Sequence, residues 1–144
     1  MARNAVITGG GSGIGKAIGR RLVEDGFNCI LVGRNLDRLE KAVAELDEQR
    51  PDPTQKIVAI SCDVTQPKEV EDLITKIKAY FGDIGVLVNC AGRSGGGVTK
   101  SLTDELWLDV INTNLNSVFF VTRAALKSGT LASGGSIKIG RAHV

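Results

Sequence analysis

The chain has 144 residues, of which 42% are hydrophobic, and this length and composition suit a single domain with a buried core. Its 18 basic and 16 acidic residues are spread along the chain and give a formal net charge of +2, which indicates neither a nucleic acid nor a membrane surface as partner. No apolar run approaches the length of a membrane span, and no signal-peptide layout precedes the first strand, so we expect a cytoplasmic protein.

The cysteines predict reduced thiols. Cys29, Cys62 and Cys90 are odd in number, lie in apolar surroundings and form no C-x-x-C pair, so neither a disulfide nor a zinc site is expected. The single histidine, His143, lies near the C-terminus, and we assign it no catalytic or metal-binding role.

A glycine-rich turn near the N-terminus is the first candidate functional element. It follows a short apolar strand at residues 5–7 and leads into an apolar helical period at residues 14–23. The unpaired N–H groups and the positive dipole end of such a helix suit a pyrophosphate, and glycines permit its close approach. The sequence therefore predicts a dinucleotide site, with an ordinary flexible turn as the alternative. The expected binding residues are Gly9, Ser12, Gly13, Ile14 and Gly15.

Strands and helices alternate along the rest of the chain. The expected elements are a strand at 28–32, a helix capped by Asn35 that reaches about Gln49, a strand at 57–60, a helix at 70–81, a strand at 86–88, a helix from Thr103 to about Lys127, and a strand that begins at 135–137. The buried face of the second helix is expected to consist of Leu36, Leu39, Val43 and Leu46. This alternation predicts an α/β fold with a doubly wound parallel sheet, the Rossmann plan, covered by helices on both faces.

The residue after the second strand is expected to select the cofactor, because ligands of open α/β sheets bind outside the carboxyl ends of the strands. An NAD enzyme typically offers an acid there, whereas this chain has Arg34, whose guanidinium suits the 2′-phosphate of NADP. The nearby acid Asp37 lies in the first turn of a helix, where a carboxylate complements the dipole. We therefore expect NADP, with a solvated surface arginine as the alternative interpretation of Arg34.

The turn has the form T-G-x-x-x-G-x-G, which resembles the cofactor loop of the short-chain dehydrogenase/reductase family, and the resemblance covers residues 4–137. It implies that Asp63 and Val64 hold the adenine ring, although Asp63 could instead cap the turn that follows it. The segment Asn89-Cys90-Ala91-Gly92 resembles the family's N-N-A-G, with Cys90 in place of the second asparagine. By this resemblance Asn89, Ala91 and Gly92 are cofactor-binding residues, and the last two leave room beside the ribose and nicotinamide.

Asn114 falls on the apolar stripe of the last long helix, where a buried amide needs partners. A structural asparagine bonded to neighbouring backbone is one interpretation. The resemblance implies a second one, because the asparagine of an N-L segment on this helix supports a water chain to the catalytic lysine in the family. Asn114 and Leu115 match that segment, so Asn114 is the candidate catalytic residue.

The segments 93–97, 104–110 and 113–115 are similar to aromatic polyketide ketoreductases, which are relatives of 3-oxoacyl carrier-protein reductases. This similarity implies NADPH-dependent reduction of a ketone, either a small molecule or a chain on a carrier protein, by a homo-oligomeric full-length parent. It also implies that residues 94–96 border the substrate cleft, unless they form a flexible loop. The alternatives are an alcohol or sugar dehydrogenase of the same family and a non-catalytic nucleotide-binding module.

The family's catalytic Y-x-x-x-K pair is absent, because the only tyrosine, Tyr80, is followed four residues later by Ile84. We expect the catalytic serine, tyrosine and lysine to lie outside the chain, so that the fragment is inactive. The expected domains are an incomplete, C-terminally truncated NADP-binding Rossmann domain at residues 1–138 and a non-native tail at 139–144. The tail can be back-translated as the opening of a sequencing-library adapter, and Lys138 would place a charge inside a buried strand.

Overall fold

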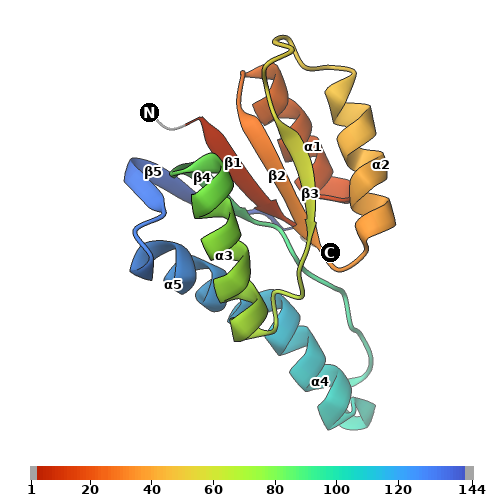
Figure 1. The fold of residues 1–144 in the computed structure, drawn as a ribbon. Helices are drawn as coiled ribbons and strands as arrows, with labels where there is room; N and C mark the ends of the chain where they lie inside the picture. Colours follow the sequence, from red (N-terminus) through yellow and green to blue (C-terminus); the bar gives the residue numbers. More distant parts are fainter. Residues whose placement is uncertain (1–2, 142–144) are drawn as a thin grey trace.

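The structure, a computed structural model, describes residues 3–141. These residues form a five-stranded parallel sheet of order β3-β2-β1-β4-β5, with helices on both faces (Figure 1). The strands are β1 (Asn4–Thr8), β2 (Asn28–Gly33), β3 (Ile57–Ser61), β4 (Ile84–Asn89) and β5 (Leu131–Ile139). The helices are α1 (Gly13–Glu24), α2 (Leu36–Asp47), α3 (Pro67–Phe81), α4 (Asp104–Ile111) and α5 (Ser117–Lys127), with a 3₁₀ turn at Thr99–Ser101. The predicted doubly wound α/β fold is confirmed.

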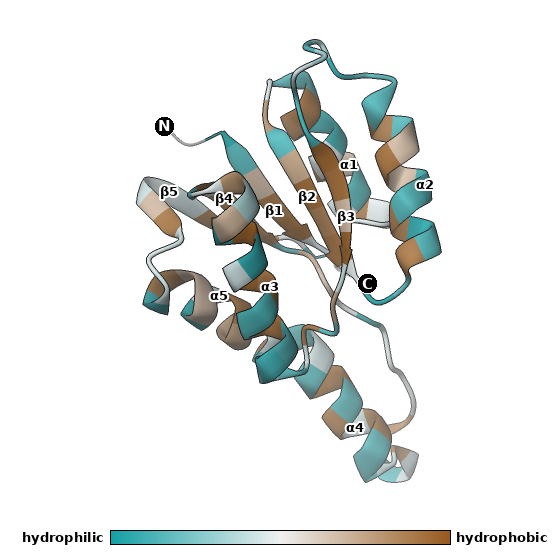
Figure 2. Ribbon diagram, viewed as in Figure 1, coloured by the Kyte–Doolittle hydropathy of each residue, from teal (hydrophilic) through white to brown (hydrophobic). Residues whose placement is uncertain are grey.

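The central strand β1 shows why the sheet is covered on both faces. Val6 belongs to the apolar cluster formed with α3 and α5, whereas its neighbours Ala5 and Ile7 belong to the cluster formed with α1 and α2. All three side chains are fully buried. Because successive strand residues point to opposite faces, a continuous apolar run requires helices on both sides. Figure 2 shows mainly hydrophobic strands flanked by helices that carry both hydrophobic and hydrophilic residues.

The strand order reverses direction at β1, which lies between β2 and β4. The carboxyl ends of β1 and β4 are therefore adjacent, with Thr8 paired to Asn89. A switch point of this kind leaves a crevice in which ligands of open α/β sheets bind. The fold places the glycine turn, which follows β1, directly at this crevice.

Two predicted helix starts are confirmed by their caps. The side chain of Asn35 accepts a hydrogen bond from the Arg38 amide at 3.0 Å, and Thr103 accepts one from the Leu106 amide at 3.2 Å. The expected burial of Leu36 is wrong, since 42% of it is exposed. Leu36 is the first residue of α2, and the stripe that packs on the sheet begins one turn later, at Leu39.

The long helix expected between Thr103 and Lys127 is interrupted. A π-helical segment, η2 (Asn112–Asn116), separates α4 from α5. Single π turns within helices concentrate at functional sites, because they shift the direction in which side chains point. This segment contains both Asn114 and the buried Thr113.

The last strand begins at Leu131, earlier than predicted, and reaches Ile139, one residue past the expected domain boundary. Lys138 does not introduce a buried charge, because β5 is an edge strand of the described sheet and this residue is exposed. His143 and the end of the expected tail lie outside the described residues. No helix within residues 3–141 is both long and apolar enough to cross a membrane.

The cysteines are free thiols. Burial raises the pKa of Cys29 to about 12 and, together with nearby carboxylates, that of Cys62 to about 11. Both thiols therefore stay protonated near neutral pH and behave as small apolar side chains.

Candidate nucleotide-binding site

The glycine turn between β1 and α1 packs tightly against the end of β4. Gly9 has a φ of +66°, and a Cβ there would lie 2.7 Å from the carbonyl oxygen of Cys90 and 2.9 Å from Cα of Ala91. A Cβ on Gly15 would collide with the carbonyl oxygen of Gly9. These two glycines are therefore required by contacts within the protein, which the sequence motif alone did not reveal.

Gly13 differs from the other two glycines. Its φ is +53°, but a Cβ at this position would meet no atom within 4 Å. A glycine at this position therefore permits a left-handed backbone conformation, and the space beside it is open. That open space lies at the start of α1, where a pyrophosphate needs to approach the backbone.

The N-terminus of α1 is available to a ligand. Ser12 occupies the N-cap position with an extended backbone, but its side chain makes no capping hydrogen bond. The first amide N–H groups of a helix have no intrahelical partner, and here the cap side chain does not satisfy them. Together with the positive end of the helix dipole, they form a cradle that fits a phosphate group.

The Thr8 hydroxyl joins the ends of β1 and β4. It accepts hydrogen bonds from the amides of Cys90 at 3.1 Å and Ala91 at 3.0 Å. The side chain of Asn89, a predicted cofactor-binding residue, lies elsewhere. It is 3% exposed, it donates to the Thr122 hydroxyl at 3.4 Å, and it lines neither of the two cavities described below. The Asn89 side chain is therefore packed inside the protein and does not line the crevice.

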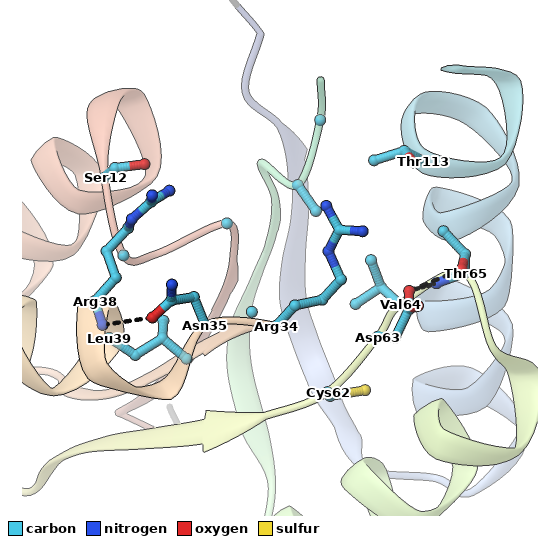
Figure 3. A pocket seen from close by; sticks show the side chains of 15 residues that line it. Ser12, Arg34, Asn35, Arg38, Leu39, Cys62, Asp63, Val64, Thr65 and Thr113 are labelled. Carbon is cyan, nitrogen blue, oxygen red and sulfur yellow. Dashed lines mark hydrogen bonds between the residues drawn. The ribbon is translucent and has the colours of Figure 1, made fainter. Parts of the chain in front are cut away.

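A cavity of about 200 Å³ opens beside the glycine turn (Figure 3). Most predicted cofactor-binding residues that follow strands line it, namely Gly9, Ser12, Arg34, Asp63, Val64, Ala91 and Gly92. Sequence reasoning missed four polar residues of the same lining: Asn35, Arg38, Thr65 and Thr113. The fold thus brings the ends of β1, β2, β3 and β4 to one cavity, as predicted for a switch point.

Arg34 and Arg38 give this cavity a positive character. Figure 3 shows Arg38 on the side of Ser12, and Arg34 pointing into the cavity between that side and the segment that carries Asp63 and Val64. Two guanidinium groups offer a forked set of donors that suits a phosphate dianion. Asp37, the acid that would favour NAD, lies in the first turn of α2 and is not part of the lining.

Asp63 closes the turn after β3 and also lines the cavity, and its contact with adenine stays a prediction. Its Oδ1 accepts hydrogen bonds from the Thr65 amide at 3.0 Å and the Thr65 hydroxyl at 2.7 Å, so one oxygen closes the turn after β3. The residue also lines the cavity, next to the buried side chain of Val64. The turn fixes the carboxylate in place, and its other oxygen stays available as an acceptor.

A second cavity of about 500 Å³ adjoins the first and shares Gly9, Ser12 and Gly92 with it. It is lined by the remaining predicted site residues, Gly13, Ile14, Gly15 and Asn114, and by Cys90, Arg93, Ser94, Gly140 and Arg141. Burial raises the pKa of the Cys90 thiol, and the Gly140 backbone and Arg141 oppose that rise. Except for Asn89, every predicted site residue lines one of these two cavities.

Asn114 holds the loop that follows β4. Its Oδ1 accepts a hydrogen bond from the Arg93 amide at 3.0 Å, and its Nδ2 donates to the Arg93 carbonyl at 2.8 Å. The Arg93 side chain pairs with Asp109 on α4, and a Cβ on Gly95 would lie 2.5 Å from a methyl group of Val110. The loop therefore contacts the helix at Arg93 and Gly95. Support of a catalytic lysine by Asn114 stays a prediction.

Replacing Asn114 with alanine should release this loop. The loss of two hydrogen bonds to Arg93 should lower the free energy of unfolding by about 1–3 kcal/mol, because both backbone groups lose a partner. Hydrogen exchange of the Arg93 amide should accelerate as well. Asn116→Ala is the matched control, since Asn116 donates only to Asn112 on the same segment. Unchanged exchange in Asn114→Ala would show that other contacts hold the loop.

Together, the parallel sheet, the glycine turn at its switch point and the uncapped helix N-terminus define a Rossmann-type protein. The family model described as short chain dehydrogenase matches residues 3–139, and the chain belongs to this family. The family binds NAD or NADP, and the cradle at α1 and the adjoining cavity lined by Arg34 and Arg38 fit such a dinucleotide.

Three similar proteins illustrate the range of the family. A putative ketoacyl reductase of Streptomyces coelicolor is 41% identical over 135 residues, which are 94% of this chain and 50% of that protein. A crystal structure of an actinorhodin polyketide ketoreductase variant with NADPH is 41% identical with a TM-score of 0.82, covering 89% of this chain and 48% of that one. An alcohol dehydrogenase from Thermococcus sibiricus, complexed with 5-hydroxy-NADP, is 34% identical with a TM-score of 0.84, covering 95% and 57%. The chain spans about half the length of the curated relatives it matches.

Proposed function

We propose that the chain forms the NADPH-binding half of a short-chain reductase that reduces a ketone to an alcohol. The observation that carries this proposal is that Arg34 and Arg38 line the first cavity, which reaches the open N-terminus of α1 at Ser12. The arginines suit a phosphomonoester and the helix N-terminus suits a pyrophosphate, and NADPH presents both groups. NADH lacks the phosphomonoester, so this arrangement favours NADPH.

Different residues would bind different parts of the NADPH molecule. The backbone amides of Gly13, Ile14 and Gly15 would hold the pyrophosphate, with the Ser12 hydroxyl beside them. Asp63 and Val64 would border the adenine, and Arg34 the 2′-phosphate. Bound NADPH would supply a hydride to the carbonyl carbon of the substrate.

The nicotinamide end would lie in the second cavity. Gly92, which lines both cavities, leaves space there, and a Cβ on Gly92 would lie 2.7 Å from Oδ1 of Asn114. The loop that begins at Arg93 forms one wall. We propose that this wall borders the substrate and that Asn114 supports catalysis by positioning it.

The proposed substrate is a 3-oxoacyl or polyketide-type ketone, free or bound to a carrier protein. It is supported by the similarity to a putative ketoacyl reductase and to a polyketide ketoreductase. The similarity to an alcohol dehydrogenase favours the runner-up, oxidation of an alcohol or sugar by the same cofactor site. The chain itself supplies no Tyr-x-x-x-Lys pair, and Tyr80 is 76% exposed on α3, so we propose that these 144 residues alone bind without turnover.

We also propose that the parent enzyme is a homo-oligomer of the cytoplasm. Large apolar side chains along α4, η2 and α5 are more than half exposed, and they are Trp107, Leu108, Leu115, Phe119 and Leu126. An exposed apolar strip of this size favours association with another protein surface. A second copy of the parent enzyme is the proposed occupant.

A chimera tests the proposed reaction. Residues 1–138 would be joined to the C-terminal half of the S. coelicolor putative ketoacyl reductase, which is 41% identical in the shared part. The chimera should oxidise NADPH in the presence of a 3-oxoacyl thioester, whereas the 144-residue chain should not. A folded chimera that binds NADPH and reduces no ketone, but oxidises alcohols with NADP, would replace the proposal with the runner-up.

A further inference from the structure

One residue that lines the cavity beside Arg34 has a buried polar atom without a partner. Among the residues that the structure describes, the hydroxyl oxygen of Thr113 is buried and makes no hydrogen bond. The residue as a whole is 7% exposed. A buried hydroxyl without a partner is costly, so its presence calls for an explanation.

The helix could have satisfied this hydroxyl but does not. Other alcohol side chains on helices of this chain bond to the carbonyl four residues earlier, and two examples lie on α3 and α5. Ser117 donates to the Thr113 carbonyl at 2.6 Å, and Thr75 donates to the Glu71 carbonyl at 2.9 Å. Thr113 lies in the π-helical segment η2, where this pattern is interrupted, and its hydroxyl makes no such bond.

Thr113 lines the cavity together with residues that follow β3. Figure 3 shows its side chain on the side of Val64 and Thr65. Because the hydroxyl oxygen is buried while the side chain lines the cavity, the methyl group is the part turned toward the ligand space. A rotation about χ1 exchanges two groups of similar size, and threonine commonly occupies two rotamers in helices. The rotation would place the methyl group in the buried position and the hydroxyl in the cavity.

We propose that Thr113 is a further cofactor-binding residue, which binds the adenosine half of NADPH through its hydroxyl. This inference rests on the NADPH site proposed above. The hydroxyl can donate to a ring nitrogen or accept from an amine or ribose hydroxyl, groups that adenosine presents next to Val64. Binding thus gives the unpaired hydroxyl its partner, and the nucleotide gains a contact in addition to the one available at the second oxygen of Asp63.

The test uses the full 144-residue chain and isothermal titration with NADPH and with 2′,5′-ADP, which carries only the adenosine half. Thr113→Val keeps the shape of the side chain but removes the hydroxyl, and Thr113→Ser keeps the hydroxyl. The valine variant should bind both ligands about tenfold more weakly, as the loss of one hydrogen bond predicts, and the serine variant within about twofold of the unsubstituted chain. Thr75→Val, outside this cavity, is the matched control.

A melting curve without nucleotide shows that the variants fold. The midpoint of Thr113→Val should equal or exceed that of the unsubstituted chain, because a buried unpaired hydroxyl is lost. Equal affinities of Thr113→Val and the unsubstituted chain would overturn this inference and leave the NADPH site intact. If Thr113→Val lost affinity for NADPH but not for 2′,5′-ADP, the inference would also be overturned, because the contact would then lie outside the adenosine half. Failure of the unsubstituted chain to bind either ligand would refute the proposed function itself.

Discussion

Gly9→Ala should abolish NADPH binding and lower the free energy of unfolding by about 2–5 kcal/mol. Two costs combine at this position. The φ of +66° is unfavourable for any residue with a Cβ, and that Cβ would lie 2.7–2.9 Å from backbone atoms of Cys90 and Ala91. Backbone atoms cannot yield as a flexible side chain can, so the turn would move away from β4. Urea unfolding and NADPH titration measure the two effects.

Gly13→Ala is the control that separates the cost of the backbone conformation from the cost of steric contact. Its φ of +53° carries a similar conformational cost, but the added Cβ meets no atom of the described protein within 4 Å. The loss of stability should therefore be about 1–2 kcal/mol, from conformation alone. Equal losses in the two variants would show that contact with Cys90 and Ala91 does not govern the turn.

Arg34→Asp should reverse the cofactor preference. The substitution removes a charge-assisted pair with the 2′-phosphate and places a carboxylate in the same cavity, so NADPH affinity should fall about 100-fold. The new carboxylate can accept from the 2′-hydroxyl of NADH, whose affinity should stay equal or rise. Titrations of both nucleotides, followed by the fluorescence of the reduced nicotinamide, give the two dissociation constants.

Arg20→Asp makes the same change of charge on the exposed surface of α1, away from the cavity lining. This control should alter NADPH affinity less than about twofold at physiological salt, because exposed charges beyond a Debye length are screened. If Arg20→Asp weakens NADPH binding as strongly as Arg34→Asp, then only net charge matters, and the proposed pairing with the 2′-phosphate is wrong.

The sheet could be predicted because its strands carry continuous apolar runs. Val6 is buried against one face of the sheet and Leu31 against the other, and an apolar run that needs cover on both faces is compatible with few other structures. The helix caps at Asn35 and Thr103 could also be predicted from the sequence, because an N-cap depends on local sequence alone. The predicted order of elements therefore agrees with the structure.

The features of the site that the sequence did not predict depend on contacts between segments that are distant in the chain. Burial of Asn89 against Thr122 follows from how α5 packs on β4, which no local pattern encodes. Arg38 and Thr113 reach the cavity only because α2 and η2 lie beside it. The four-residue spacing between Arg34 and Arg38 was one available signal. For the π-helical segment at Asn112–Asn116 we find no signal in the sequence.

The measurement that tests the central claim most directly is a titration of the 144-residue chain with NADPH and, separately, with NADH. We expect saturable binding of NADPH and at least about tenfold weaker binding of NADH, because only NADPH carries the phosphate that Arg34 and Arg38 can pair with. Equal affinity for the two nucleotides would contradict the assignment of the arginines. A folded chain that binds neither nucleotide would contradict the nucleotide site as a whole.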